Sequence, residues 1–600
     1  MKTIDWIIFG VYLLTIIAIG VSKGVRSRTT QQFLLADRRM PWWAIGLSVM
    51  ATQASAITFI GTTGKAYNDG MKFIHFYLGL PLAMVILCVT LVPLYHRMKV
   101  YTAYEYLGRR FDEKTRLLSS ILFLISRALA LGVVVYAPSV VLAMLLNWDL
   151  KYTILLMASV AIAYTVLGGI QAVIWTDVFQ MMLMFGGLVF CGVWMVIHLP
   201  EGVAFGDAMH LAGTVGHLNA LDLSFDPKSK YTLWAGLIGG TFLFLAYFGC
   251  DQSQAQRLLT SRSLRDTRLS LIFNAFLKLP MQFAILLIGV LLFAFLQFAD
   301  QPQMHFNPKL PDAITHGEHH DDYTTIETSY GEAFAVRRQA AQSLIDARPA
   351  NDAAVLNAAQ SAYRTAHQRV VEIRADADRL VKVHDDAYED TNYVFPTYVL
   401  TQLPVGIVGL IIAVVFAAAM SSIDSELNAL STSSTMDIYR RHIRTNAGDR
   451  HYIWASRLLT LLWGLIAAGF ALYAKYLGSV IEAVNQVGSY FYGSLLGVFV
   501  LALAYKRGNG HGAFWGLIAG MITVCIVGPP WDKLEKWDWF WSQMQDHHWL
   551  KPDGSPPWDV AWLWLNPIAC AAVLVVGIIV SELTRSPDDR DTSTDASLAD

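Results

Sequence analysis

Residues 51–64 read Ala51-Thr-Gln-Ala-Ser-Ala-Ile-Thr-Phe-Ile-Gly-Thr-Thr-Gly64, and they lie within a long apolar stretch, 41–66. Small, polar and glycine residues at this density weaken a continuous helix. In a bilayer, unwound backbone persists only where it lines a cavity or is buried in protein, and its free carbonyls can coordinate a cation. The stretch therefore predicts a membrane helix that is broken near its centre. Close packing of unbroken helices through small residues is the alternative.

The whole chain has the composition of an all-α polytopic membrane protein. Hydrophobic residues make up 54% of its 600 residues and charged residues 15%, whereas soluble domains carry about 25% charged residues. Apolar runs of about 20 residues, the length that crosses a bilayer core, recur along the chain. About thirteen candidate spans cover residues 4–22, 41–66, 73–97, 117–146, 152–171, 176–198, 231–253, 270–298, 398–424, 453–476, 479–505, 511–530 and 558–581.

The loops between these spans alternate in charge, which predicts the topology. Lys and Arg cluster in residues 23–40, 97–116, 257–268, 440–450 and 506–507, whereas the opposite short loops hold few. Basic loops face the cytoplasm. The first apolar run also precedes its basic cluster, which favours a retained helix over a cleaved signal. We therefore expect a multi-pass protein of the cell membrane, with the N-terminus outside and the C-terminus in the cytoplasm.

Three segments are not expected to cross the membrane. Residues 300–397 form a polar insertion on the outer side, in which Tyr363, Val370 and Ala377 recur at heptad spacing and predict a helical hairpin. A Trp-rich outer stretch, 531–558, is typical of the headgroup zone. The tail within 582–600 is rich in Asp and Ser and is typical of disorder. The cysteines lie in or at apolar spans and predict neither a disulfide framework nor a thiolate metal site.

Ionisable and hydroxyl side chains inside the spans mark candidate functional positions, because hydrocarbon makes them costly. Ser421, Asp424 and Ser425 share one face of the ninth span, and their oxygens suit a hard cation such as sodium. The alternative is a helix that emerges into water, taking Asp424 and Glu426 with it. Asp177 begins the sixth span and could be an ordinary helix N-cap.

Two cations and a second weakened helix complete this set. Arg127 lies mid-span, where neither capping nor snorkelling explains it, whereas Lys278 is nearer the start of its span and could snorkel. In the seventh span, residues 239–257, an aromatic pair is followed by Gly249 and a polar run, which predicts another helix that breaks. A cluster of histidines and aspartates within 305–322 could bind metal, but it lacks fixed helical spacing.

Taken together and in this order, four motifs resemble the sodium:solute symporter family, over nearly the whole chain up to Lys506. The motifs are Phe33-Leu-Leu-Ala-Asp-Arg38, Gly168-Gly-Ile-Gln-Ala-Val-Ile-Trp-Thr-Asp177, Gly249-Cys-Asp-Gln-Ser-Gln-Ala-Gln-Arg257 and Ala418-Ala-Met-Ser-Ser422. The resemblance implies an inverted-repeat core of five plus five helices. Residues 1–40 would precede it, 41–198 and 231–505 would be the two repeats, and 506–581 would add two further helices.

The resemblance also implies the site residues. The sodium ligands would be the carbonyls of Ala51, Ala54 and Ala418 and the hydroxyls of Ser421 and Ser422. Ligands of a possible second sodium would be Asp177, Asp424 and Ser425, with Asp424 standing where other members have Ser. The solute positions implied by the resemblance are Thr58, Arg127, Tyr247, Lys278 and Gln486.

The solute is less defined than the ion. Lys278 is similar to a residue of the sugar carriers, whereas Gly132-Val-Val-Val-Tyr-Ala-Pro138 is similar to the monocarboxylate, iodide and vitamin branch. A buried arginine can hold a carboxylate by two charge-assisted hydrogen bonds. Arg127 therefore favours an organic anion over a neutral sugar, unless a neighbouring acidic side chain pairs with it.

The expected function is secondary active symport, in which sodium drives import of a small organic solute by alternating access. No phosphate-binding loop of the G-x-x-x-x-G-K-[ST] type occurs, so nucleotide-driven transport and a bound cofactor are not expected. No separate basic domain points to nucleic acid. The alternatives are a proton-coupled carrier, in which Asp177 and Asp424 carry protons, a transporter-like solute sensor, and a membrane enzyme. The sequence does not give the oligomeric state.

Overall fold

The structure is a computed structural model that describes residues 2–24, 28–146, 148–299, 302–349, 352–385, 388–473, 480–528 and 560–585. These residues are helical throughout, apart from loops and one isolated bridge between Met40 and Ser261. The predicted all-α class is therefore confirmed. The Trp-rich stretch 531–558 and the tail from Ser586 lie outside the described residues.

The first half of the chain forms α1 (Thr3–Gly24), α2 (Thr30–Leu35), η1 (Ala36–Arg38), α3 (Trp42–Gln53), α4 (Ala56–Asp69), η2 (Gly70–Tyr77), α5 (Leu80–Val89), α6 (Leu91–Met98), α7 (Ala103–Arg110), α8 (Glu113–Leu146), α9 (Leu150–Ile197) and α10 (Phe205–Thr214). The second half forms η3 (Ala235–Gly239), α11 (Gly240–Leu245), η4 (Ala246–Cys250), α12 (Gln252–Leu259), α13 (Leu264–Leu296), α14 (Asp312–Thr315), α15 (His320–Ala347), α16 (Ala353–His384), η5 (Thr391–Tyr393), α17 (Val394–Gln402), α18 (Ile407–Ser433), η6 (Ser434–Ile443), α19 (Asp449–Ala471), α20 (Val480–Ala504), α21 (Gly510–Val527) and α24 (Trp562–Leu583).

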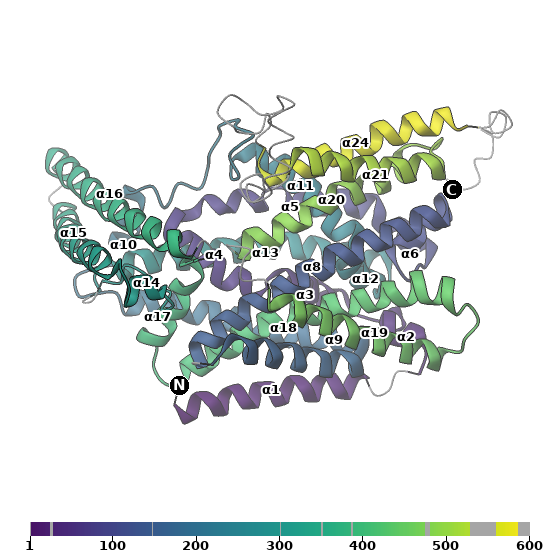
Figure 1. The fold of residues 1–600 in the computed structure, drawn as a ribbon, viewed down its shortest axis with the longest axis horizontal. Helices are drawn as coiled ribbons and strands as arrows, with labels where there is room; N and C mark the ends of the chain where they lie inside the picture. The colour runs from purple at the N-terminus through teal and green to yellow at the C-terminus, as the bar shows by residue number, and fades with distance from the viewer. Residues whose placement is uncertain are drawn as a thin grey trace.

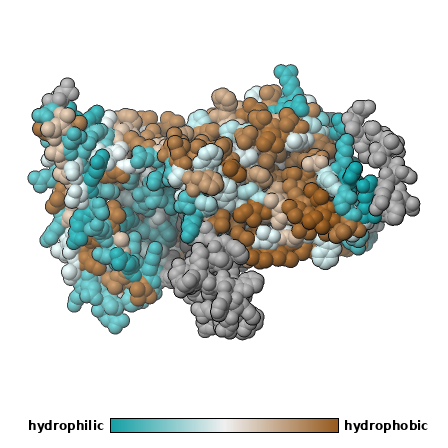
Figure 2. Space-filling model, turned by 90° about the horizontal axis from the view of Figure 1, so that it is seen from above, coloured by the Kyte–Doolittle hydropathy of each residue, from teal (hydrophilic) through white to brown (hydrophobic). Residues whose placement is uncertain are grey.

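Within the described residues, 10 helical stretches are long and apolar enough to cross a membrane. The thirteen predicted spans exceed this number for two reasons. Thr58–Met98 and Leu150–Ile197 each cover parts of two predicted spans, and the predicted span 231–253 corresponds to the shorter apolar helix Ala235–Cys250. Figure 2 shows the hydrophobic surface that such a bundle presents over much of its body, away from the hydrophilic end formed by α15 and α16.

Both predicted helix breaks are confirmed. The second span divides into α3 and α4 at Ala54 and Ser55. The seventh divides at Asp251, an extended residue (φ −80°, ψ 124°) between η4 and α12, whose side chain accepts the amide of Ser253 at 2.8 Å and so caps α12. Neither break uses proline. Each leaves backbone groups free for side chains of other helices, which is tolerated in a membrane only inside protein.

α9 contains two passes joined by a sharp bend at Gly169. A straight helix of 48 residues would be about 72 Å long, more than twice the bilayer core. Tyr164 and Thr176 flank the bend, and their hydroxyls lie 2.8 and 3.4 Å from the same oxygen of Asp424. On a straight helix they would be about 18 Å apart along the axis. The chain therefore folds back at Gly169, where φ is +59°.

The basic loops gather at one end of the bundle. Arg110 Nη2 donates to Tyr505 O at 3.1 Å, and Arg262 Nε donates to Arg39 O at 2.7 Å. In Figure 1 this end, with α2 and α6, lies on the right, whereas the N-terminus, α15 and α16 lie on the left. One expectation about these loops is wrong: Arg257 is not a loop residue but is fully buried in α12.

The insertion contains α15 and α16, which lie side by side at the end opposite the basic loops (Figure 1). Tyr363, Val370 and Ala377 are buried where the heptad pattern placed them. The hairpin also docks onto the bundle, because Tyr363 donates to Gln297 of the loop after α13 at 2.6 Å. The nearby His305 contacts Tyr323 and Asp378, each at 2.8 Å. Among the described residues, no three His, Cys, Asp or Glu side chains are grouped to hold a metal.

Candidate functional site

The break between α3 and α4 faces the middle of α18. Ala54 ends α3 with φ −92° and ψ 59°, and its amide donates to Ala51 O at 3.1 Å. Thr58 Oγ1, at the start of α4, donates to Gln53 O across the break at 3.3 Å. Because the helical ladder stops here, carbonyls of the last turn of α3 are available to other groups.

Oxygen atoms of α3 and α18 converge at this break. Ser421 Oγ lies 3.1 Å from Ala51 O and 3.1 Å from Ala418 O. Ser422 Oγ lies 2.9 Å from Thr52 O and 3.5 Å from Ala418 O. Both serines are buried. A buried group of carbonyl and hydroxyl oxygens at a broken membrane helix has the chemistry of a cation site.

A second buried group lies beside the first, and a guanidinium occupies its centre. Arg257 donates from Nη2 to Asp177 Oδ2 at 3.2 Å and to Ser425 Oγ, and from Nε to Ser48 Oγ at 2.7 Å. Ser425 Oγ lies 3.1 Å from Asp424 Oδ1. The three residues predicted for a second sodium therefore lie together, and an arginine side chain lies between two of them. The sequence does not indicate this partner, because Arg257 begins a run of basic residues that is typical of a loop.

The alternative interpretations of these acidic residues are wrong. Asp177 is not an N-cap, since it lies inside α9 after the bend at Gly169. Asp424 and Glu426 do not emerge into water, because their exposed fractions are 0% and 4%. These carboxylates are therefore part of the buried polar interior of the bundle.

Arg127 of α8 lies in a third group, and it is paired. Its Nε donates to Asp251 Oδ2 at 2.7 Å, its Nη1 donates to Glu426 Oε1 at 2.8 Å, and its Nη2 reaches Asp251 and the hydroxyl of Tyr492. The guanidinium also lies 5.3 Å from the ring centroid of Tyr247. The acidic-neighbour alternative therefore holds. Arg127 therefore does not need an anionic solute to balance its charge.

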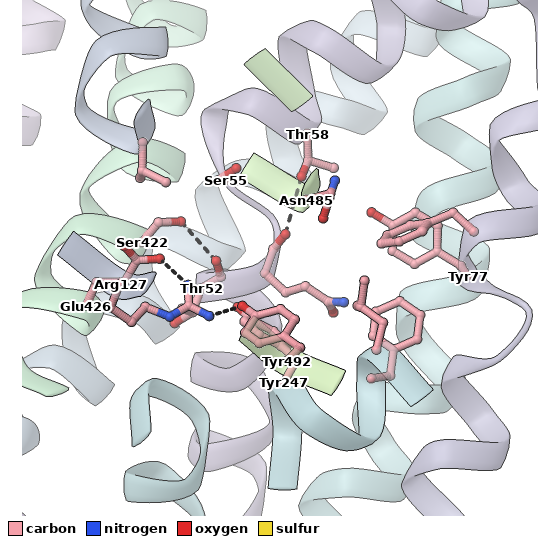
Figure 3. A pocket seen from close by; sticks show the side chains of 15 residues that line it. Thr52, Ser55, Thr58, Tyr77, Arg127, Tyr247, Ser422, Glu426, Asn485 and Tyr492 are labelled. Atoms are coloured by element: carbon pink, nitrogen blue, oxygen red, sulfur yellow. Dashed lines mark hydrogen bonds and ion pairs between the residues drawn. The ribbon is translucent and has the colours of Figure 1, made fainter. Parts of the chain in front are cut away.

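A cavity connects the break with Arg127. It encloses about 690 Å³ of empty space, including solvent at its mouth. Figure 3 shows Arg127 and Glu426 on one side of it and Tyr77 on the other, with Thr58 and Asn485 between them. Its lining consists of Thr52, Gln53, Ser55, Thr58, Phe76, Tyr77, Arg127, Val134, Leu243, Phe244, Tyr247, Ser422, Glu426, Asn485 and Tyr492.

Three of the five predicted solute residues line this cavity and two do not. Thr58, Arg127 and Tyr247 belong to its wall. Lys278 is buried in α13, and its Nζ lies 5.6 Å from the ring centroid of Tyr77, with no hydrogen-bond partner in the described part of the chain. Gln486 donates to the hydroxyl of Tyr490 at 3.1 Å.

Sequence reasoning missed the remaining polar lining, including Gln53, Ser55, Glu426 and Asn485. For Glu426 a signal was present, since it follows Ser422 by one helical turn and shares its face. For Asn485 and Tyr492 on α20 only the packing of that helix against the broken helices decides which residues reach the cavity.

Comparisons with known proteins find similar proteins over most of the chain. A sequence model of the Sodium:solute symporter family matches residues 33–327 and 375–520, leaving out the middle of the insertion. The Sodium-dependent multivitamin transporter of Oryctolagus cuniculus is 27% identical over 97% of this chain and 82% of its own. The Sodium-coupled monocarboxylate transporter 2 of Bos taurus is 24% identical over 97% and 84%, and the Sodium/iodide cotransporter of Homo sapiens 25% over 86% and 68%.

A solved structure shares the fold. It is the substrate-bound outward-open state of a Na+-coupled sialic acid symporter, with a TM-score of 0.72 and 23% identity over 97% of this chain and 98% of that one. The likeness shows the inverted-repeat transporter core that the sequence predicted. Because the family model covers more than half of the chain, this protein belongs to the sodium:solute symporter family, whose members are membrane transporters and not enzymes.

Proposed function

We propose that the transported sodium binds to Ala51, Ala54, Ala418, Ser421 and Ser422, and that the solute binds in the cavity beside it. The observation that carries this proposal is the double role of Ser422, which belongs to the oxygen cluster and also lines the cavity. An ion held at the break fixes the backbone of α3 and α4 and thereby the wall that a solute contacts. Binding of either one then favours binding of the other.

We further propose that transport is inward, with the N-terminus outside and the C-terminus in the cytoplasm. The gathering of basic loops at the end opposite α15 and α16 supports this orientation. Residues 41–198 and 231–505 would be the two repeats that rock around the site. A negative interior potential adds about 2.3 kcal/mol per charge per 100 mV to sodium entry.

For the cluster of Asp177, Asp424 and Ser425, we propose that the guanidinium of Arg257 takes the place of a second sodium while it lies between Asp177 and Ser425. A second sodium at Asp177, Asp424 and Ser425 would require this guanidinium to withdraw, because two cations would compete for the same oxygens. Sodium at the first site is therefore the principal coupling ion. The solute residues retained in this proposal are Thr58, Arg127 and Tyr247.

Sodium dependence tests the first site. Ser421→Ala and Ser422→Ala each remove one oxygen ligand, so the sodium concentration for half-maximal stabilisation of the purified protein should rise, by about tenfold or more. Ser361→Ala, on an exposed turn of α16, is the matched control and should leave it unchanged. The measurement is the melting temperature in sodium against choline at fixed pH. A wild-type protein that responds equally to both salts contradicts the proposal.

A further inference from the structure

The solute cavity contains a buried carboxylate oxygen that nothing in the described residues pairs. Glu426 lines the cavity, and its Oε1 accepts a hydrogen bond from Arg127 at 2.8 Å. Its Oε2 is buried and has no hydrogen-bond donor among the described residues. An unpaired buried acceptor is costly, and more so when it is charged. A donor from a molecule bound in the cavity would therefore stabilise Glu426.

The cationic wall residue is not available for an anion. Arg127 makes four hydrogen bonds, to Asp251 twice, to Glu426 and to Tyr492. Turning the guanidinium toward a solute carboxylate would leave Asp251 and Glu426 unpaired in the interior. The free energy lost by these two buried charges exceeds the free energy gained from one new ion pair. Lys278 does not line the cavity.

The charges of the Arg127 ion-pair group balance without a charged solute once sodium is bound. Arg127 carries one positive charge, and Asp251 and Glu426 carry two negative charges. Sodium at Ser422 would add the second positive charge one helical turn from Glu426. The Arg127 group together with this sodium is then neutral, and a carboxylate solute would place an excess negative charge beside the unpaired oxygen of Glu426.

The remaining lining suits a solute with both hydroxyl groups and apolar faces. Aromatic rings of Phe76, Tyr77, Phe244, Tyr247 and Tyr492 form much of the wall. Gln53 adds a second buried acceptor, Oε1, that lacks a donor in the part of the chain described. Aromatic walls with a few converging polar groups are typical of small-molecule sites.

We infer that Glu426 is a specificity-determining residue, and that it accepts a hydrogen bond from a hydroxyl of a neutral, polyhydroxylated, sugar-like solute. Arg127 and Asp251 are positioning residues that hold the carboxylate in place. The inference rests on the proposed solute cavity, and it runs against the carboxylate expectation that the names of the relatives suggest.

Matched pairs of solutes test this inference in the full-length protein. The probes are D-glucose with D-glucuronate, D-galactose with D-galacturonate, and glycerol with lactate, each added at saturating sodium and again in choline. The melting temperature should rise with a neutral member of a pair in sodium, and rise less with its carboxylate. Stabilisation by carboxylates alone, or by none of the neutral members, overturns the inference.

The variant Glu426→Gln tests whether this residue determines the preference for neutral over carboxylate solutes. Glutamine keeps a carbonyl oxygen for Arg127 but offers an amide donor in place of Oε2. The ratio of neutral to carboxylate affinity should fall at least about tenfold, because a hydrogen bond to a charged group is lost and an anion is no longer repelled. Glu372→Gln, on the solvent face of α16, is the control and should keep the wild-type ratio.

A purely structural role for Glu426 would lower the melting temperature without moving this ratio, and that result would contradict the assignment. The two proposals also fail separately. If sodium itself does not stabilise the wild-type protein, the sodium site is wrong. If sodium does so but the preference for neutral solutes is absent, only the inference about Glu426 is wrong.

Discussion

Single buried charges decide most of what is distinctive in the site. The sequence leaves the partner of Arg127 open and places Arg257 in a loop. In the structure Arg127 pairs with Asp251 and Glu426. Arg257 pairs with Asp177, also from another helix. Residue type and depth in a span could be predicted, because both are local. Partners could not, since Asp251 and Glu426 are far from Arg127 in sequence.

The Arg127 group yields a residue-scale prediction. Arg127→Gln leaves Asp251 and Glu426 without a counter-charge, so the protein should lose about 3–5 kcal/mol of stability. Adding Asp251→Asn removes one of the stranded charges and keeps a good helix cap. The double variant should therefore melt above Arg127→Gln alone, a coupling that a double-mutant cycle measures. Arg369→Gln on exposed α16 is the control. Strict additivity of the two changes would show that the pair does not interact.

At the scale of elements, the broken helices were predictable and the bend in α9 was predictable only in part. Runs of small and polar residues at membrane depth indicate the broken segments. The two halves of α9 were correctly separated by length. That a single glycine makes the bend follows only from the structure, in which Gly169 adopts φ +59° against the backbone of Phe33.

Gly169 provides the element-scale prediction. A Cβ at this position would lie 2.5 Å from Phe33 O, and the φ angle is one that alanine rarely adopts. Gly169→Ala should therefore destabilise the protein by at least about 1–3 kcal/mol, seen as a lower melting temperature. Gly186→Ala in the same helix is the matched control, because a Cβ there meets nothing within 4 Å. Equal melting temperatures for the two variants would count against the bend.

At the scale of the whole molecule, the insertion is more firmly attached than its polar sequence suggests. Arg374 pairs with Asp390 at 2.5 Å, and Asp390 accepts the amides of Phe306 and Asn307 at 2.6 and 2.7 Å. Arg374 also lies over the ring of Tyr67 in α4, the second half of the broken helix. The hairpin thus contacts α4, which contributes Thr58 to the cavity wall, although the family model omits the middle of the hairpin.

Two histidines at this docking surface predict a dependence of stability on pH. Burial lowers the pKa of His217 to about 4 and that of His367 to about 3, and both rings pack near Phe293. Arg337 lowers both pKa values further, whereas Asp69 raises that of His217. The unfolded chain takes up protons near pH 6.5, but the folded protein does not. The contribution of these neutral histidines to the free energy of unfolding is therefore fully present above about pH 6.5. It is lost as the pH decreases toward 4.

The measurement is the melting temperature from pH 8 to pH 4 for wild type and for His217→Gln/His367→Gln. The double variant should lose less stability across this range, since its side chains do not titrate. His442→Gln is the control, because this histidine is exposed in η6, away from the docking surface of the hairpin. This variant should follow the wild-type curve. Superimposable curves for wild type and the double variant would show that these histidines do not contribute.

The sequence by itself determined the membrane class, the approximate positions of most spans and the two broken helices. These features depend on local composition and on helical periodicity, which a single chain displays directly. The tertiary structure alone decided that Arg127 and Arg257 are paired, that Glu426 reaches the cavity while Lys278 and Gln486 do not, and that the insertion touches α4. The physical reason is that a buried charge is defined by its partners, and those partners are brought together only by the packing of helices distant in sequence.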